Sequence, residues 1–158
     1  MAMKRLLLTL MLLGPSLLIF AQDYPFSVVK SGTGKQTVIF IPGFACSGNV
    51  WAETVSVLED SYTCYVLTMA GFSGVAPEDC PSFERWKIQI AKFIKEERIE
   101  KPILVGHSMG GVLALAIAAE FPELTGKIVI VDALPCLMAL RVPDFKSAPD
   151  NDCTDLID

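Results

Sequence analysis

Residues 103–120 read ILVGHSMGGVLALAIAAE. The apolar run at 103–105 predicts a buried strand, and the mostly apolar stretch from Met109 to Glu120 predicts a helix. The pentapeptide between them, GHSMG at 106–110, fits the pattern G-x-S-x-G. A strand, a sharp turn and a helix in this order indicate a nucleophile elbow, in which the hydroxyl of Ser108 stands above the carboxyl edge of a sheet.

Glycines surround Ser108 on both sides, at Gly106, Gly110 and Gly111. We expect them to let the backbone turn at positive φ and to let strand and helix approach closely. The turn places the Ser108 hydroxyl at a helix N-terminus, where the dipole favours developing negative charge. Ser108 is therefore the predicted nucleophile, and the alternative is a serine that only caps the helix.

The rest of the chain alternates short strands with helices. The glycine-rich segment at 31–34 predicts a hairpin turn between a first strand and an apolar strand at 37–41. Further elements are predicted as a strand at 62–68, a buried strand at 127–131, and helices at 49–60 and 82–98. This order is typical of βαβ units, so we predict an α/β sandwich with helices on both faces of a parallel sheet.

Two of the predicted helices carry an apolar stripe that should face the sheet. In the helix at 49–60 the stripe consists of Val50, Trp51, Val55 and Leu58. In the helix at 82–98 it consists of Phe83, Trp86, Ile90, Phe93 and Ile94. Ser82 is the predicted N-cap of that second helix.

The N-terminus has the layout of a secretory signal peptide. Two basic residues, Lys4 and Arg5, precede an apolar run at 6–20. A retained membrane anchor is the alternative, but a Gly-Pro pair interrupts the run, which falls short of the roughly 20 apolar residues that cross a bilayer. We therefore predict that residues 1–21 are a signal peptide and that 22–158 are exported, periplasmic or secreted, without a stable membrane anchor.

The charge and the cysteines argue against several classes of function. The net charge is −5, and removal of the predicted signal leaves 11 basic residues against 18 acidic ones, a net charge of −7. This balance argues against nucleic acids and anionic membrane surfaces as partners. The five cysteines, an odd number, form no CxxC pair, which argues against structural zinc and redox motifs.

Four motifs together resemble those of the α/β-hydrolase family. They are GHSMGG at 106–111, IPGF at 41–44, MAGFSGV at 69–75 and IVIVDALP at 128–135. The resemblance covers nearly all of the sequence after the signal and is greatest to small exported or periplasmic hydrolases. It implies a three-layer α/β-hydrolase fold with a mostly parallel sheet, in which 22–158 form the N-terminal portion of a single domain and a lid segment begins near residue 135.

The resemblance also implies an oxyanion hole built from two backbone N–H groups. One belongs to Met109, directly after the nucleophile, and the other to Phe44 in the loop after the first buried strand. Many relatives begin that loop with His-Gly, whereas this chain has Pro42-Gly43. The side chain of Phe44 has an alternative interpretation as a core aromatic, which the backbone role does not exclude.

Asp132 follows the predicted strand at 127–131, so its carboxylate should emerge at the same edge of the sheet as Ser108. In the family the triad acid usually comes after the next strand, but some members place it here. Asp132 is therefore the candidate triad acid. The alternative is a structural residue that binds backbone amides of the loop that follows.

His107 is the only histidine, and a serine nucleophile needs an imidazole hydrogen-bonded to its hydroxyl. The residue before Ser108 on a sharply turning backbone should point away from that hydroxyl, so His107 is predicted to pack at the elbow or to form part of the pocket wall. In the family the catalytic histidine follows the last strand. We therefore favour a fragment, with lid, last strands and histidine beyond Asp158, over a naturally short chain without a complete triad.

The resemblance implies a serine hydrolase that acts on a carboxylic ester or a related acyl substrate through an acyl-enzyme. We expect a small-molecule substrate, no metal or organic cofactor, and activity in the full-length form, with the 158 residues alone inactive. One alternative is a non-catalytic binding protein that kept the elbow. Another is an acyltransferase, or a different reaction of the same fold.

Overall fold

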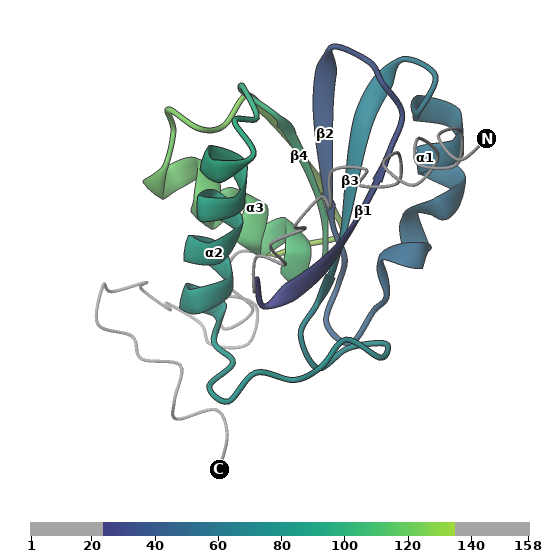
Figure 1. Ribbon diagram of the computed structural model, residues 1–158. Helices are drawn as coiled ribbons and strands as arrows, with labels where there is room; N and C mark the ends of the chain where they lie inside the picture. The colour runs from purple at the N-terminus through teal and green to yellow at the C-terminus, as the bar shows by residue number, and fades with distance from the viewer. Residues whose placement is uncertain (1–23, 135–158) are drawn as a thin grey trace, which may run out of the picture.

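The computed structural model describes residues 24–134, which form one five-stranded sheet flanked by helices (Figure 1). In spatial order the strands are β1 (Phe26–Ser31), β3 (Tyr62–Met69), β2 (Gln36–Ile41), β4 (Ile103–His107) and β5 (Lys127–Val131). β1 runs antiparallel to β3, whereas β3, β2, β4 and β5 are parallel to one another. The predicted mostly parallel sheet is confirmed.

Helices cover both faces of this sheet, as predicted, so the fold has three layers. The 3-10 helix η1 (Gly48–Trp51) and α1 (Ala52–Leu58) lie on one face, and α2 (Phe83–Glu96) and α3 (Met109–Glu120) lie on the other (Figure 1). Among residues 24–134, no helix has the length and apolar character needed to span a bilayer. The predicted signal peptide and the predicted lid segment lie outside the described residues.

β2 lies at the middle of the sheet because its side chains are apolar on both faces. Ile39 and Ile41 belong to the larger core cluster, with residues of α2 and α3, while Val38 and Phe40 pack with Trp51 in the cluster on the α1 side. The four β2 residues are at most 3% exposed. Because burial of each such side chain stabilises a fold by about 1.5–3 kcal/mol, β2 stabilises both halves of the core.

α2 begins at its predicted cap and is tied to α3 by a buried lysine. The Ser82 hydroxyl accepts a hydrogen bond from the Arg85 N–H at 3.1 Å, which confirms the predicted N-cap. Lys87 is only 8% exposed and pairs with Glu84 and with Glu120 of α3. Burial acts to lower the pKa of Lys87, but the hydrogen bonds to the two carboxylates outweigh it, and the pKa lies above its ordinary value.

Two residues of the predicted apolar stripes face solvent, so the prediction was wrong for them. Phe83 is 38% exposed and Val50 is 55% exposed. Phe83 is the first residue of α2, ahead of the turns that reach the core. Val50 lies in η1, which has about 3 residues per turn. In this 3-10 helix the neighbouring Trp51 is buried in the core and Val50 faces solvent.

The predicted hairpin between β1 and β2 is wrong. β1 pairs with β3, from Phe26 opposite Met69 to Ser31 opposite Cys64, so β3 lies between β1 and β2. β2 is apolar on both faces and takes a covered central place between two parallel neighbours, whereas β1 is partly exposed and occupies an edge. Burial across the whole sheet therefore overrides the local turn signal.

The glycines of the predicted hairpin turn lie where the chain passes close to the backbone at the start of β3. A methyl group on Gly32 would lie 2.1 Å from the carbonyl oxygen of Tyr62, and one on Gly34 would lie 2.0 Å from that of Ser61. The Thr63 hydroxyl donates a hydrogen bond to the Gly34 carbonyl at 2.7 Å. Close backbone contact with β3 therefore explains why this segment is rich in glycine.

β5 is less buried than its apolar sequence predicts. Val129 and Val131 are 47% and 40% exposed, so the expectation of a buried strand is wrong for residues 24–134. Val129 lies opposite Val105, which packs in the cluster on the α1 side. Within the described part of the chain, α1 reaches Val105 but no helix covers the same face of β5, and β5 is the last strand of the sheet.

The strand order predicts a cost for a single methyl group at Gly34. We expect Gly34→Ala to lower the free energy of unfolding by about 1–3 kcal/mol, because the new methyl would meet the backbone of β3. Urea denaturation of the full-length protein measures this, with Lys35→Ala as the matched exposed control. If Gly34→Ala costs less than about 0.5 kcal/mol, as an ordinary surface position does, the crossing over β3 is not the true arrangement.

Candidate active site

Ser108 lies at the sharp turn between β4 and α3, as the sequence predicts. Its backbone has φ 52° and ψ −119°, a strained conformation for a residue other than glycine. Its N–H donates to the Val131 carbonyl at 2.9 Å, and its own carbonyl accepts hydrogen bonds from Gly111 at 2.9 Å and Val112 at 3.2 Å. The turn is thus fixed on one side by β5 and on the other by the first turn of α3.

The flanking glycines serve close packing and not the positive φ itself, which falls on Ser108. A methyl group on Gly106 would lie 2.2 Å from the Gly110 carbonyl oxygen, and one on Gly110 would lie 2.2 Å from the Ile41 carbonyl oxygen. A methyl on Gly111 would lie 2.6 Å from Cβ of Ala133. The expectation of close approach is therefore confirmed, and the predicted turn at positive φ is present, with the positive φ on Ser108.

The loop after β2 lies directly against the elbow. A methyl group on Gly43 would lie 3.4 Å from Cβ of Ser108 and 2.9 Å from Nδ1 of His107. The backbone N–H of Phe44, the next residue, and that of Met109, at the start of α3, donate no hydrogen bond to any acceptor within residues 24–134. The loop after β2 and the start of α3, which meet at Ser108, therefore each have one backbone N–H without an acceptor among the described residues.

The Phe44 side chain is not part of the core, which corrects that alternative interpretation. It is 69% exposed, and its ring packs edge-to-face on Phe72 with centroids 5.2 Å apart. Phe72 in turn packs edge-to-face on Trp86 of α2 at 5.8 Å. Trp86 belongs to the predicted apolar stripe of α2, whereas Phe72 lies in the motif MAGFSGV, where no apolar periodicity predicts its packing.

His107 is half-buried and its ring lies against the backbone of Gly43. This packing accords with the predicted role at the elbow.

Asp132 emerges at the same edge of the sheet as Ser108, as predicted. His107 and Val131 lie opposite each other in the β4–β5 pair, so Ser108 and Asp132 are the next residues on adjacent strands. Asp132 is exposed, with φ 48°. The amides that a structural role would engage belong to the following segment, which beyond Leu134 lies outside the described residues.

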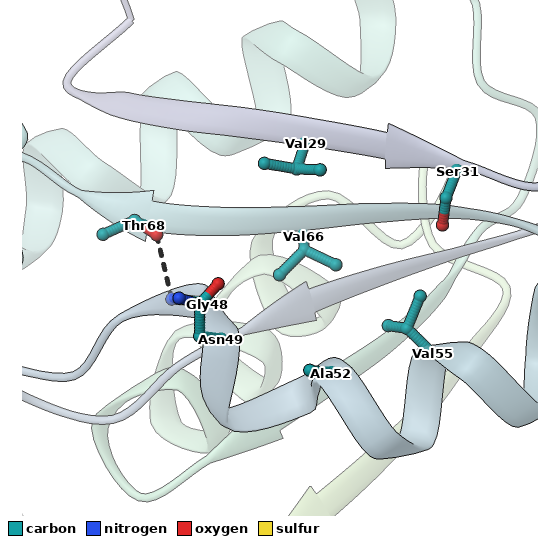
Figure 2. Close-up of a pocket in the computed structure, with 8 residues that line it drawn as sticks. All are labelled: Val29, Ser31, Gly48, Asn49, Ala52, Val55, Val66 and Thr68. Carbon is teal, nitrogen blue, oxygen red and sulfur yellow. Dashed lines mark hydrogen bonds between the residues drawn. The ribbon is translucent and has the colours of Figure 1, made fainter.

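The cavity in Figure 2 lies away from the elbow. It has a volume of about 150 Å³ and opens between β1, β3, η1 and α1, with an apolar wall that includes Val29, Val55 and Val66. The Gly48 N–H donates to the Thr68 hydroxyl at 2.9 Å along one side (Figure 2). None of the predicted site residues lines this cavity.

Other side chains that could carry chemistry are less well placed than Ser108. Burial and, next, the charge of Glu59 raise the pKa of the Cys64 thiol, which disfavours the reactive thiolate. Cys46 and Cys80 are the other cysteines within residues 24–134, and none of the three forms a disulfide there. The same residues contain no cluster of three His, Cys, Asp or Glu side chains placed to hold a metal ion.

Comparison with known proteins adds an independent finding. Residues 36–151 match the family model of the alpha/beta hydrolase fold. The chain is 30% identical over 105 residues to the pimeloyl-[acyl-carrier protein] methyl ester esterase of Vibrio cholerae, which covers 66% of this chain and 39% of that protein. It is 31% identical over 103 residues to the dihydrolipoyllysine-residue acetyltransferase component of the acetoin cleaving system of Cupriavidus necator, covering 65% of this chain and 28% of that protein.

Solved structures show the same relationship. A marine microorganism esterase superposes with a TM-score of 0.64 at 25% identity, covering 68% of this chain and 41% of the esterase. A meta-cleavage product hydrolase superposes with a TM-score of 0.61 at 31% identity, with the same coverage of the two chains. The matched region thus spans well under half the length of the relatives and structures it resembles.

Proposed function

Because this chain belongs to the α/β-hydrolase family, we propose that it is the N-terminal part of a serine hydrolase that cleaves a carboxylic ester or a related acyl compound. The observation that carries the proposal is the conformation of Ser108. Ser108 is a strained serine between β4 and α3, held by backbone hydrogen bonds on both sides, at the N-terminus of α3 and against the loop that carries Phe44.

The proposed reaction has two halves. In the first, Ser108 Oγ attacks the acyl carbon, its proton passes to an imidazole base, and the C–O bond of the ester breaks as the alcohol leaves with that proton. The N–H groups of Phe44 and Met109 bind the oxyanion that forms on the acyl oxygen. In the second half, water attacks the acyl carbon of the acyl-enzyme and gives its proton to the base. The bond between Ser108 Oγ and the acyl carbon then breaks, the base returns the proton to Oγ, and the acid is released.

The base in this proposal is a histidine from outside the 158 residues. His107 is the only histidine in the sequence, and its ring lies against Gly43, which supports a packing role. The activity therefore belongs to the full-length form, and the 158 residues alone are inactive. Asp132, at the same edge as Ser108, is the acid that we propose for orienting the base.

The named relatives support the substrate class and also define the second candidate. The Vibrio cholerae relative is a methyl ester esterase, which supports hydrolysis of an ester. The Cupriavidus necator relative is an acetyltransferase component, which favours acyl transfer as the alternative. Both reactions would use an acyl group on Ser108, and an alcohol that competes with water for that group would distinguish transfer from hydrolysis.

The first prediction of this proposal concerns Ser108 itself. In the full-length protein, Ser108→Ala should lower hydrolysis of nitrophenyl acyl esters by roughly 10⁴-fold or more. It should also abolish covalent labelling by a fluorophosphonate, measured as a mass shift of the protein. Ser56→Ala is the control, because that hydroxyl only donates to the Glu53 carbonyl on α1. The non-catalytic binding protein is favoured if the parent protein binds the ester without any turnover and Ser108→Ala binds it equally well.

A second prediction separates the two roles of Asp132. If it orients the base, Asp132→Asn should lower kcat by about 10⁴-fold while leaving the unfolding temperature nearly unchanged. If it only binds backbone amides, the unfolding temperature should fall and kcat should stay within about tenfold. Asp60→Asn, at an exposed position before β3, is the control for loss of a surface carboxylate.

We also propose that the protein is exported and that its N-terminal 21 residues are removed. The intact mass of the protein recovered from the exported fraction should then correspond to a chain that begins near residue 22 and continues beyond residue 158. A mass that matches 22–158 alone would leave the mature chain without a second histidine and would contradict the serine-histidine mechanism.

A further inference from the structure

Three aromatic rings form a continuous row from the loop after β2 to α2, and we call Phe44, Phe72 and Trp86 the aromatic row. Phe44 packs edge-to-face on Phe72 at 5.2 Å, and Phe72 packs edge-to-face on Trp86 at 5.8 Å. The burial increases along the row, from Phe44 at 69% exposed to Trp86 at 7%. The row therefore connects an exposed loop beside Ser108 to a residue fixed in the core.

The loop that carries Phe44 is strained and needs support. Ala45, the next residue, has φ 57°, a left-handed conformation that costs a residue with a side chain roughly 1–3 kcal/mol. One backbone hydrogen bond closes the turn, from the Cys46 N–H to the Gly43 carbonyl at 3.2 Å. Since such strain persists only where surrounding contacts hold it, the packing of Phe44 on Phe72 contributes to the position of this turn.

Phe72, in the middle of the row, has a well-defined backbone. Its N–H donates to the Met69 carbonyl at 3.2 Å, and its carbonyl accepts from Val75 at 2.9 Å. Met69 is fully buried at the end of β3. The ring of Phe72 is therefore presented to Phe44 from an anchored turn.

Glu78 holds the inner end of the row. One carboxylate oxygen accepts a hydrogen bond from the indole Nε1 of Trp86 at 2.6 Å, and the other pairs with the guanidinium of Arg85. The Glu78 side chain is only 11% exposed, so the carboxylate is largely removed from water and both of its oxygens have donors. Without Glu78 the Trp86 N–H would be left without a partner in a buried place, which is costly.

We infer that Glu78 is a positioning residue for the proposed oxyanion hole, acting through Trp86 and Phe72 on the turn that carries the Phe44 N–H. The inference rests on the proposed function for its catalytic consequence. An oxyanion donor acts mainly in the transition state, so its displacement should lower kcat with little change in KM.

The test uses the full-length protein and three substitutions. Glu78→Met removes the acceptor but keeps a side chain of similar length, and Glu78→Gln keeps an acceptor for the Trp86 N–H. Asp79→Asn, at the exposed carboxylate next to Glu78, is the control. We expect Glu78→Met to lower kcat by about tenfold with KM within about twofold, since small displacements at a reacting centre can cost up to about 10². Glu78→Gln should restore most of the loss, and Asp79→Asn should match the parent.

A second readout does not depend on activity. Amide deuterium exchange in the peptide that contains residues 43–46 should be faster in Glu78→Met than in the parent, and near the parent rate in Glu78→Gln. Phe72→Leu, which interrupts the aromatic row without touching Glu78, should give the same changes in exchange and in kcat. It keeps the test decisive if Glu78→Met fails to fold.

The outcomes separate the inference from the proposed function. Unchanged exchange at 43–46 in both Glu78→Met and Phe72→Leu overturns the inference, and so does faster exchange with unchanged kcat, or a loss that appears in KM alone. If the parent shows no turnover that depends on Ser108, the proposed function fails, while the exchange result still decides whether Glu78 controls the Phe44 turn.

Discussion

The start of α3 packs directly against the ends of β2 and β4 and the residues that follow β5, and the rest of the candidate site depends on this contact. A methyl group on Gly110 would meet the Ile41 carbonyl, and one on Gly111 would meet Ala133. Such a contact leaves no space for a side chain, because packed interiors give way only at a cost. The position of Ser108 is therefore fixed by three strands and one helix together, and no single loop determines it.

Backbone strain is concentrated at the same edge of the sheet. Each of the four parallel strands is followed within four residues by a residue other than glycine with a positive φ: Ala45 after β2, Ser73 after β3, Ser108 after β4 and Asp132 after β5. Such conformations cost roughly 1–3 kcal/mol each and persist where the surrounding structure holds them. These strained residues therefore lower the stability of the fold at the edge of the sheet where Phe44, Ser108 and Asp132 emerge.

The two faces of the sheet contribute differently to this edge. On the α2 and α3 side, the core continues from Trp86 through the aromatic row to the exposed ring of Phe44, so packing in the interior supports the loop beside Ser108. On the α1 side, the cavity of about 150 Å³ lies between β1, β3 and α1, and none of the predicted site residues lines it. The chemistry proposed for Ser108 is therefore supported from the α2 and α3 face.

Local sequence rules determined the elements and the elbow. The structure confirms α3 at Met109–Glu120, β5 at Lys127–Val131, the Ser82 cap and the turn at Ser108, because apolar periodicity, capping and glycine spacing act within a few residues. Only the tertiary structure decided that β1 pairs with β3, that Phe44 is exposed and that Glu78 holds Trp86. These outcomes depend on which distant segments compete for the same buried space, and that competition leaves no local pattern in the sequence.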